Sequence, residues 1–451
     1  MPDDVFAALA TGTGGLCAVR LLSQAQRSKH LLLLRLIVVT ATRIGHPQAR
    51  ELARAYDLLV AAQLRRPSDV DPVLCHPPVG AWAIRAWRNL RRGDALDCGY
   101  LAALAASAAL LAGMESAIEV PLTNGAVFLP FLGRMDLAFG GVAETVVVRS
   151  WSHGGEILVP SVRVAIPLNR ECDSDGWSGL RRLTVNFGES STSFILDDLD
   201  PYRLPGAPTT GRLDAVDVGM WYRTLSDAWA LLVVSHPETA EEVAAGVAVL
   251  VPLQAPSGHQ VSATSRHSFG AVALSLPRHG RFFAVTLAHE CQHLKLCALL
   301  DLVTLIDDPG ERRWYAPWRE DPRPLGALLQ GAYAHVGVAA FWRKQRYVDR
   351  GIAALQAHAE FARWRDETQH VITTLQTSGA LTSDGAFFVE GMAARLEMWA
   401  AEPVPAAAVQ RARAAAAEHR MAWRRRHGRL REDHGTSWET TATTELDSYD
   451  S

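Results

Sequence analysis

Apolar residues recur every three or four positions in the two end regions of the chain, whereas the middle region carries short β-branched runs. The helical spacing is plain in segments 50–64 and 81–90, and it returns in segments 280–305, 324–348, 350–378, 384–401 and 404–426. In the middle, runs such as 145–148 and 193–195 lie between Gly, Asn, Asp and Pro residues, which is typical of strands joined by turns. The pattern predicts an α+β protein that is mainly helical.

The same pattern divides the chain into three regions and a tail. We expect a helical region over 1–114, a β-rich region over 115–277 that a helix near 216–235 crosses, and a helical region over 278–428. Segment 429–451 is polar and acidic, which predicts a disordered tail. The most apolar stretch, 31–40, is far shorter than the roughly 20 residues that span a bilayer, so it predicts a buried helix or strand.

Composition excludes several classes of function. The chain has 451 residues, of which 48% are hydrophobic and 21% charged, as in ordinary globular proteins. Its 45 basic and 48 acidic residues give a net charge of −3, so we expect no broad basic surface that could hold nucleic acid or an anionic membrane. The six cysteines form no CxxC pair, and residues 1–4 are acidic where a secretory signal would be basic, so we expect a cytoplasmic protein.

The candidate chemistry is concentrated in one apolar helix that carries His289, Glu290 and His293. Two histidines four residues apart lie on one helix face about 6 Å from each other, so one divalent metal can bind both. In zinc peptidases with this HExxH motif the glutamate is a general base, whereas in an iron site it could orient a ligand. The motif arises by chance in about 3 of every 100 such chains, and a buried helix with hydrogen-bonded histidines is the alternative. Its apolar flanks favour a metal, because buried polar groups without partners are costly.

A third protein ligand is expected, and His335 is the best candidate. It lies on an otherwise apolar helix, one antiparallel hairpin beyond the HExxH helix. Asp301 is about 12 Å along the helix from His293, too far to reach the same ion. Cys297, one turn past His293, would suit zinc better than iron, but a cysteine there is more typical of core packing.

Two loops near the HExxH helix offer groups that could hold a substrate. One loop, 314–324, joins the two helices, and the other, 261–270, precedes them. The candidates are Tyr315, Trp318, Arg319 and Arg323 in the first loop, and Ser265 and Arg266 in the second. The arginines could pair with a carboxylate, although a solvated surface loop would have the same polarity.

The residues around these candidates carry a family resemblance. Segments 261–277, 287–302 and 314–343 resemble the actinobacterial HExxH-motif peptide-modification family, described as 2-oxoglutarate-dependent HExxH-type peptide β-hydroxylases. Segments 75–82 and 110–132 are similar to the N-terminal half of that family, so the resemblance covers most of the chain. Cys291 departs from it, because an aromatic residue is expected there.

The resemblance implies an Fe(II) oxygenase that hydroxylates a Cβ position in a ribosomally made precursor peptide, in some pathways beside a radical-SAM maturase. It implies that His289 and His293 bind the iron, with His335 as our candidate for completing the site, while Glu290 is either an iron ligand itself or a group that orients one. The candidates for the far carboxylate of 2-oxoglutarate are Arg319, Arg323 and, in reserve, Arg266. The candidates for peptide contact are Tyr315, Trp318 and Ser265. We expect one integrated catalytic unit, because the resemblance spans both halves of the chain.

Two other classes of function stay open. A zinc metallopeptidase would use Glu290 to activate water, although Leu296 and Leu299 replace the glycine and the third histidine of the metzincin motif. A non-catalytic peptide-binding scaffold would use the HExxH segment only as part of its core.

Overall fold

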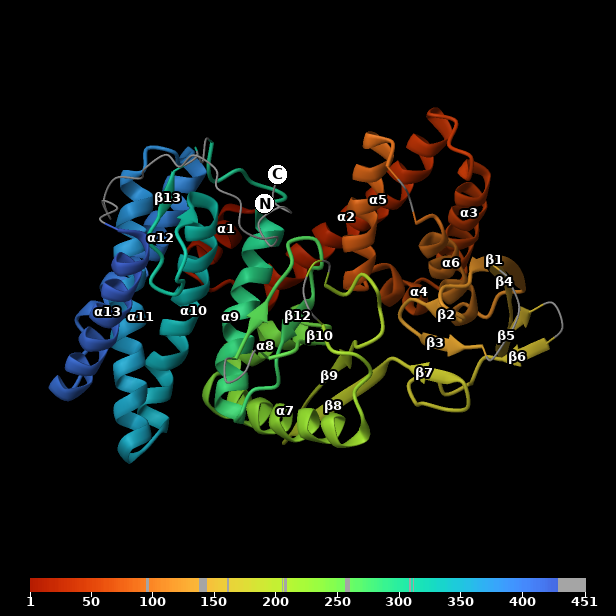
Figure 1. The fold of residues 1–451 in the computed structure, drawn as a ribbon. Helices are drawn as coiled ribbons and strands as arrows, with labels where there is room; N and C mark the ends of the chain where they lie inside the picture. The colour runs from red at the N-terminus through yellow and green to blue at the C-terminus, as the bar shows by residue number, and fades with distance from the viewer. Residues whose placement is uncertain are drawn as a thin grey trace.

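The computed structural model confirms a mainly helical α+β fold. It describes residues 1–428 except 95–96, 138–143, 160–161, 205, 207–208, 256–259, 308–309 and 311. The predicted tail at 429–451 therefore lies outside the described residues. The molecule is elongated, with the helices between residues 49 and 111 and two small sheets toward one end and the C-terminal helices at the other, where the helix of residues 3–10 also lies (Figure 1).

Six helices build the N-terminal region as described. They are α1 (Asp3–Ala10), α2 (Gly15–Arg43), α3 (Ala49–Arg65), α4 (Pro67–Leu74), α5 (Pro77–Arg92) and α6 (Gly99–Leu111). The apolar stretch 31–40 belongs to α2, a helix of 29 residues. Helices α4 and α5 each begin at a proline, where the missing N–H has no helical partner to lose.

Two small antiparallel sheets follow and pack against α6. The first has the strand order β1-β4-β5-β6 and the second β2-β3-β7. Their strands are β1 (Ser116–Pro121), β2 (Ala126–Leu129), β3 (Gly133–Asp136), β4 (Thr145–Trp151), β5 (Gly154–Val159), β6 (Val162–Ala165) and β7 (Trp177–Gly179). Burial alternates along β4, as expected for a sheet with one face in the core and the other in water.

A five-stranded mixed sheet forms the centre, with the order β11-β12-β10-β9-β8. Its strands are β8 (Arg181–Phe187), β9 (Ser190–Leu196), β10 (Val249–Pro252), β11 (Ser262–Ala263) and β12 (Ala271–Leu274). Strand β10 is parallel to both neighbours, and all residues of β10 and β12 are buried because both sheet faces are covered. Helices α7 (Ala215–Ser235) and α8 (Pro237–Gly246) connect β9 to β10, so the middle region contains one helix beyond the predicted one at 216–235.

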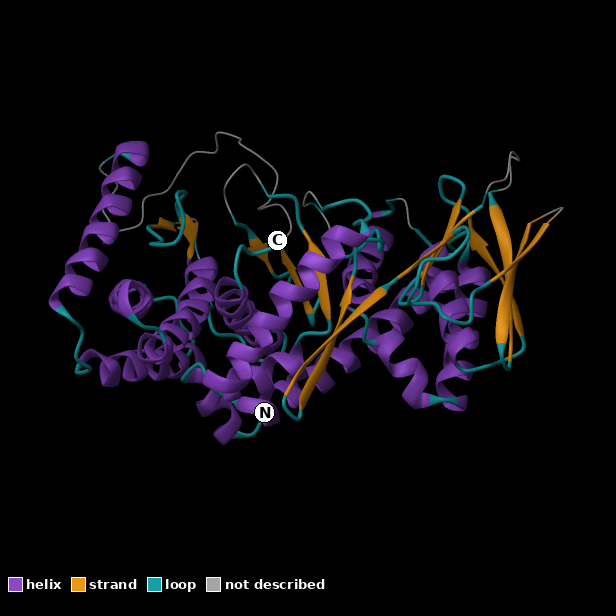
Figure 2. Ribbon diagram, turned by 90° about the horizontal axis from the view of Figure 1, so that it is seen from below, coloured by secondary structure: helices purple, strands orange, loops and turns teal. Residues whose placement is uncertain are grey.

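The C-terminal region is a set of packed helices, seen at one side of Figure 2. They are α9 (Gly280–Leu299), α10 (Leu325–Val348), α11 (Gly351–Thr377), α12 (Ser383–Ala400) and α13 (Ala406–His427). The loop between α9 and α10 contains a two-stranded ribbon, β13 (Arg313–Trp314) with β14 (Arg323–Pro324). Helix α9 follows β12 directly and packs between α7 and α10.

Specific contacts fix α9 in the centre of the largest core. On the α10 side, Gly337 permits a close approach, because a Cβ atom there would lie 2.5 Å from Cγ of Gln292. Nε2 of the same Gln292 donates to the carbonyl of Gly12 at 2.9 Å. The buried ammonium of Lys295 lies 2.8 Å from the carboxylate of Glu242 on α8. The helix that carries the HExxH motif is therefore held from two sides.

Within the described residues, no single helix combines sufficient length with sufficient apolar composition to cross a bilayer. Helices α1 and α2 pass this test only when taken together, and the chain bends by 109° between them.

Candidate metal centre

Helix α9 brings two imidazoles into contact. His289 and His293 lie one helical turn apart, and their Nε2 atoms are 3.2 Å from each other. Two nitrogens bound at about 2.0–2.1 Å to one tetrahedral ion would lie about 3.3–3.4 Å apart. The pair therefore has the spacing of two ligands of one metal ion.

Hydrogen bonds at the opposite ring nitrogens orient the candidate ligands. Nδ1 of His293 donates to Oε1 of Gln330 at 3.3 Å, and Nδ1 of His335 donates to the carbonyl of Gly331 at 2.8 Å. A donating Nδ1 fixes the tautomer in which Nε2 carries the lone pair. Metal-binding histidines commonly have such a partner on the second nitrogen.

His335 lies across the α9–α10 contact from His289, with ring centroids 5.1 Å apart. Trp318 and Trp364 contact the same imidazole at centroid distances of 4.3 and 4.6 Å, so His335 is only 6% exposed. Gly331 makes room for Trp318, because a Cβ atom there would lie 2.3 Å from the indole. The ligand atoms of the three histidines do not all lie within 4.8 Å of one another in the described structure. A three-histidine site therefore requires His335 to move toward the pair.

Glu290 is buried beside the histidine pair and is 1% exposed. Its Oε2 accepts a short hydrogen bond from the hydroxyl of Thr264, a residue that directly follows β11. Its Oε1 lies 4.0 Å from Nε2 of His289. The loop after β11 thus fixes the carboxylate where it can act on a metal ligand, directly or through water.

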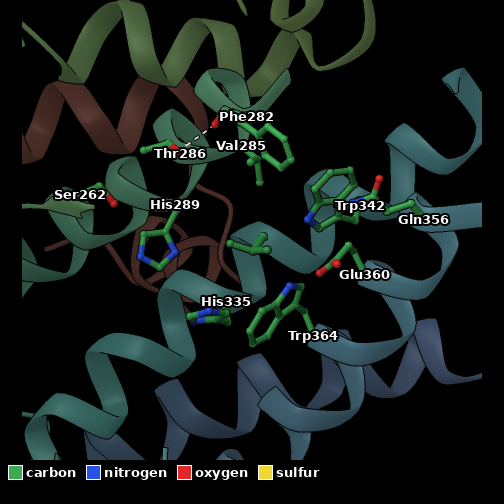
Figure 3. Close-up of a pocket in the computed structure, with 11 residues that line it drawn as sticks. Ser262, Phe282, Val285, Thr286, His289, His335, Trp342, Gln356, Glu360 and Trp364 are labelled. Carbon is green, nitrogen blue, oxygen red and sulfur yellow. Dashed lines mark hydrogen bonds between the residues drawn. The ribbon is translucent and has the colours of Figure 1, made fainter. Parts of the chain in front are cut away.

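A pocket of about 300 Å³ opens at two of the histidines. His289 and His335 lie near each other at one end, and Trp342, Gln356 and Glu360 lie at the other (Figure 3). The remaining lining residues are Ser262, Phe282, Val285, Thr286, Val338 and Trp364. Helices α9, α10 and α11 therefore form most of the wall, and the volume is at the small end of the range for ligand sites.

Burial keeps two of the imidazoles neutral. Desolvation, with the charge of the neighbouring His293 as a smaller cause, lowers the pKa of His289 to about 4. Desolvation also holds the pKa of His335 well below its ordinary value, and the charges of His289, His293 and Arg363 act in the same direction. Metal ions bind the neutral form of imidazole. These two side chains can therefore bind a metal at neutral pH without first losing a proton.

The three arginines considered for 2-oxoglutarate lie in ion pairs. Nε of Arg319 and Nη1 of Arg323 each donate to the carboxylate of Asp321 at 3.0 Å. Nη2 of Arg266 lies 3.4 Å from the carboxylate of Asp301. None of these arginines is among the described residues that line the pocket. Their role toward 2-oxoglutarate stays a prediction.

The three candidates for peptide contact lie in different surroundings. Trp318 reaches the site by stacking on His335. Tyr315 faces α13, where its hydroxyl lies 2.9 Å from Nδ1 of His419. Ser265 lies in the turn after β11, and its carbonyl accepts from the backbone N–H of Ser268 at 3.1 Å. Of these three, the structure brings only Trp318 into contact with a candidate metal ligand.

Helix α11 supplies functional candidates that the sequence did not single out. Gln356, Glu360 and Trp364 line the pocket, and Arg363 acts on His335 through its charge. In the sequence these residues belong to an ordinary amphipathic helix. Glu360 and Trp364 are four residues apart, so the sequence shows that they share one helix face. The pattern does not reveal that this face meets α10.

Comparison with known proteins adds no relative to this picture. No family model matches the chain, and no curated protein matches it. The family resemblance of the sequence therefore stays a prediction, and the chemistry of the site is inferred from its residues.

Proposed function

We propose that the chain is an Fe(II)- and 2-oxoglutarate-dependent oxygenase that hydroxylates a Cβ position in a ribosomally made peptide. The main support is the 3.2 Å spacing between the Nε2 atoms of His289 and His293, beside a pocket that His289 and His335 line. The resemblance of the sequence supports the choice of iron and 2-oxoglutarate. A reaction on newly made peptides also agrees with the cytoplasmic location that we expect from the sequence.

In such an enzyme the chain would bind and orient the reactants. The three histidines would hold the iron through Nε2 once His335 had moved toward the pair, while Gln330 orients the ring of His293. Trp318 and Trp364 cover His335 and keep water from that side of the site. Iron bound with 2-oxoglutarate would supply the oxidising power needed to break a peptide C–H bond.

Two features support a peptide as the substrate. Strand β11 is the last strand of the five-stranded sheet as described, and its residue Ser262 lines the pocket. An extended peptide can add to such an edge through backbone hydrogen bonds. Away from the histidines, the pocket offers the indoles of Trp342 and Trp364 and the carboxylate of Glu360. Aromatic faces beside a carboxylate suit a cationic side chain.

The experiment that tests this function supplies the iron-loaded protein with 2-oxoglutarate, oxygen and a precursor peptide encoded beside it. We expect succinate to form together with a peptide that has gained one oxygen atom. The double variant His289→Ala/His293→Ala should lose the iron and both products. His279→Ala should retain them, because His279 is exposed at the start of the same helix. Peptide cleavage without 2-oxoglutarate would refute the proposed oxygenase.

A zinc peptidase is the second candidate, and the position of Glu290 favours it. A buried carboxylate 4.0 Å from Nε2 of His289 is close enough to act on water at the metal. Zinc-loaded protein would then cleave peptides without 2-oxoglutarate. Because both functions would use the same histidines, the reaction products separate them and the metal content alone does not.

A further inference from the structure

A second cluster of ligand-type side chains lies where the N-terminal helices meet the five-stranded sheet. His76 is the residue before α5, and Asp197 and Asp200 follow β9; these three residues form the His76 cluster. Nε2 of His76 is 3.6 Å from Oδ2 of Asp197 and 3.9 Å from Oδ2 of Asp200. One ligand atom from each residue lies within 4.8 Å of the other two, and the described part of the chain holds no other such group of three.

The side chains of the His76 cluster are buried, and several of their polar atoms are unsatisfied. His76 is 2% exposed, and Asp197 and Asp200 are 0% exposed. Neither ring nitrogen of His76 has a hydrogen-bond partner among the described residues, and neither has Oδ2 of Asp197. Buried polar atoms nearly always have a partner. An imidazole without one, facing two carboxylates, points to a ligand that is not a protein group.

The two carboxylates are held in position by other groups. Oδ1 of Asp197 accepts from the backbone N–H groups of Leu199 and Asp200, at 3.1 and 2.9 Å. Oδ1 of Asp200 accepts from the backbone N–H of Tyr202 at 2.7 Å, and its Oδ2 accepts from the hydroxyl of Tyr100 at 2.9 Å. These bonds turn both Oδ2 atoms toward His76. Carboxylates that bind metals are commonly held in this way.

No lysine or arginine in the described part of the chain forms an ion pair with the carboxylates of the His76 cluster. Within the described residues, no lysine or arginine nitrogen lies within 4.0 Å of the carboxylate of Asp197 or Asp200, although Arg203 donates to the backbone carbonyl of Asp200 at 2.6 Å. The neighbouring Asp198 differs, because its Oδ1 lies 2.6 Å from Nη1 of Arg212. A buried carboxylate without an ion-pair partner is costly. A cation between the imidazole and the two Oδ2 atoms would compensate this charge.

We propose that Nε2 of His76, Oδ2 of Asp197 and Oδ2 of Asp200 bind one divalent metal ion of the Mn²⁺, Fe²⁺ and Zn²⁺ class. Ligands at about 2.0–2.2 Å that meet at about 90–110° lie about 2.8–3.6 Å apart. The observed 3.6 and 3.9 Å therefore need only a small contraction. An imidazole disfavours Mg²⁺ and Ca²⁺, and the absence of a thiolate from the three ligands disfavours Cu⁺.

This ion is structural, because its three ligands are buried from any substrate. It ties the start of α5 to the loop after β9, at a point where the backbone N–H of Asp197 donates to the carbonyl of Leu250 in β10 at 2.9 Å. The bound ion thus joins the N-terminal helices to the central sheet. The inference does not rest on the proposed oxygenase activity, since it uses none of the residues of the HExxH site.

The test uses the full chain with the first site removed, as the His289→Ala/His293→Ala variant. After purification and incubation with Mn²⁺, Fe²⁺ or Zn²⁺, followed by desalting, elemental analysis should find about one bound ion per chain. Adding Asp197→Asn should remove most of that metal. Asp198→Asn is the matched control and should retain it, because Asp198 already pairs with Arg212. A strong chelator should lower the unfolding temperature of the metal-loaded His289→Ala/His293→Ala variant by several degrees.

X-ray absorption spectroscopy of the same variant provides a check that does not depend on the folding of Asp197→Asn. The bound ion should have one imidazole and otherwise oxygen ligands. Sulfur or more than one imidazole in the first coordination shell would overturn the assignment. So would the absence of bound metal together with an unfolding temperature that the chelator does not change. Metal that persists in a folded Asp197→Asn protein would also place the ion elsewhere.

Discussion

The indole of Trp318 lies flat on the imidazole of His335, with ring centroids 4.3 Å apart and ring planes within 13° of each other. Trp318 comes from the loop between α9 and α10, whereas His335 lies inside α10. The loop that closes this hairpin therefore also restricts the orientation of a candidate metal ligand. Trp364 of α11 contacts the same imidazole, so three segments hold one ring.

The stacking of Trp318 on His335 should contribute to metal affinity. Trp318→Ala should weaken metal binding by about tenfold, because His335 loses the ring that restricts its rotation. Trp318→Phe should retain most of the affinity. Competition with a coloured chelator measures both values. Trp229→Phe, at a buried tryptophan of α7, is the control and should leave the metal affinity unchanged. If Trp318→Ala binds metal as tightly as the unmodified protein, Trp318 does not support metal binding.

Glu290→Gln should separate the two enzyme classes. The amide oxygen can still accept the hydrogen bond from Thr264, so the fold and the metal content should be retained. In the proposed oxygenase, where Glu290 only orients a ligand, hydroxylation should continue at a reduced rate. In a peptidase, loss of the general base should slow cleavage by about 10²–10⁴-fold. Both products are measured on the same preparation of the variant. If hydroxylation is lost completely while the metal is retained, the carboxylate of Glu290 is essential and does more than orient a ligand.

Arg363 is the arginine that we expect to matter for 2-oxoglutarate. Its guanidinium lies over the indole of the pocket-lining Trp364, 4.6 Å from the ring centroid, whereas Arg319 is 54% exposed and paired with Asp321. Arg363→Met should raise the KM for 2-oxoglutarate by about tenfold or more, and Arg319→Met should change it little. Succinate formation at varied 2-oxoglutarate measures both constants. The reverse order of effects would support the arginines of the 314–324 loop instead.

Glu360 should select the charge of the peptide side chain that enters the pocket. Its carboxylate lines the pocket with Trp342 and Trp364, so a peptide with lysine near the modified position should react faster than one with norleucine. Glu360→Gln should remove most of this difference in kcat/KM. The exposed Glu397 on α12 provides the control Glu397→Gln, which should keep it. A preference for norleucine in the unmodified protein would disprove the assigned role.

His30 should make the stability of the fold depend on pH. Desolvation lowers the pKa of this buried side chain to about 4, although its Nδ1 lies 2.9 Å from the carbonyl of Leu74. Because the unfolded chain binds the proton more readily, stability should fall as the pH drops from about 6.5 to about 4, by about 3 kcal/mol at most. His30→Gln should reduce this slope in denaturant titrations. His153→Gln, at an exposed position, should not.

Local patterns were sufficient to predict the helices and the HExxH pair, because both depend on residues within one or two turns. The sequence pattern extended the HExxH helix to residue 305, but α9 ends at Leu299. The backbone N–H groups of Leu302 and Val303 both bond to the carbonyl of Leu299, which turns the chain. Asp301 then leaves the helix and pairs with Lys29 at 2.7 Å. That partner lies on α2, so the end of α9 depends on a contact that the local pattern does not contain.

Contacts between distant segments could not be predicted in the same way. The pocket uses one face of α11, and the sequence identifies that face as amphipathic without showing which helix covers it. The His76 cluster is a stronger case. Asp197 and Asp200 form an acidic run directly after a strand, which is a recognisable signal, but nothing in the sequence pairs them with His76. Only the three-dimensional position of His76 beside the loop after β9 does so.

The residues of the two candidate metal sites are completed at different stages of translation. Residues of the His76 cluster, and the strand β10 that holds Asp197, leave the ribosome before α9 is made. N-terminal parts of a chain generally fold first. The cluster could therefore close around an ion while the chain is still being translated, whereas the HExxH site must wait for α10.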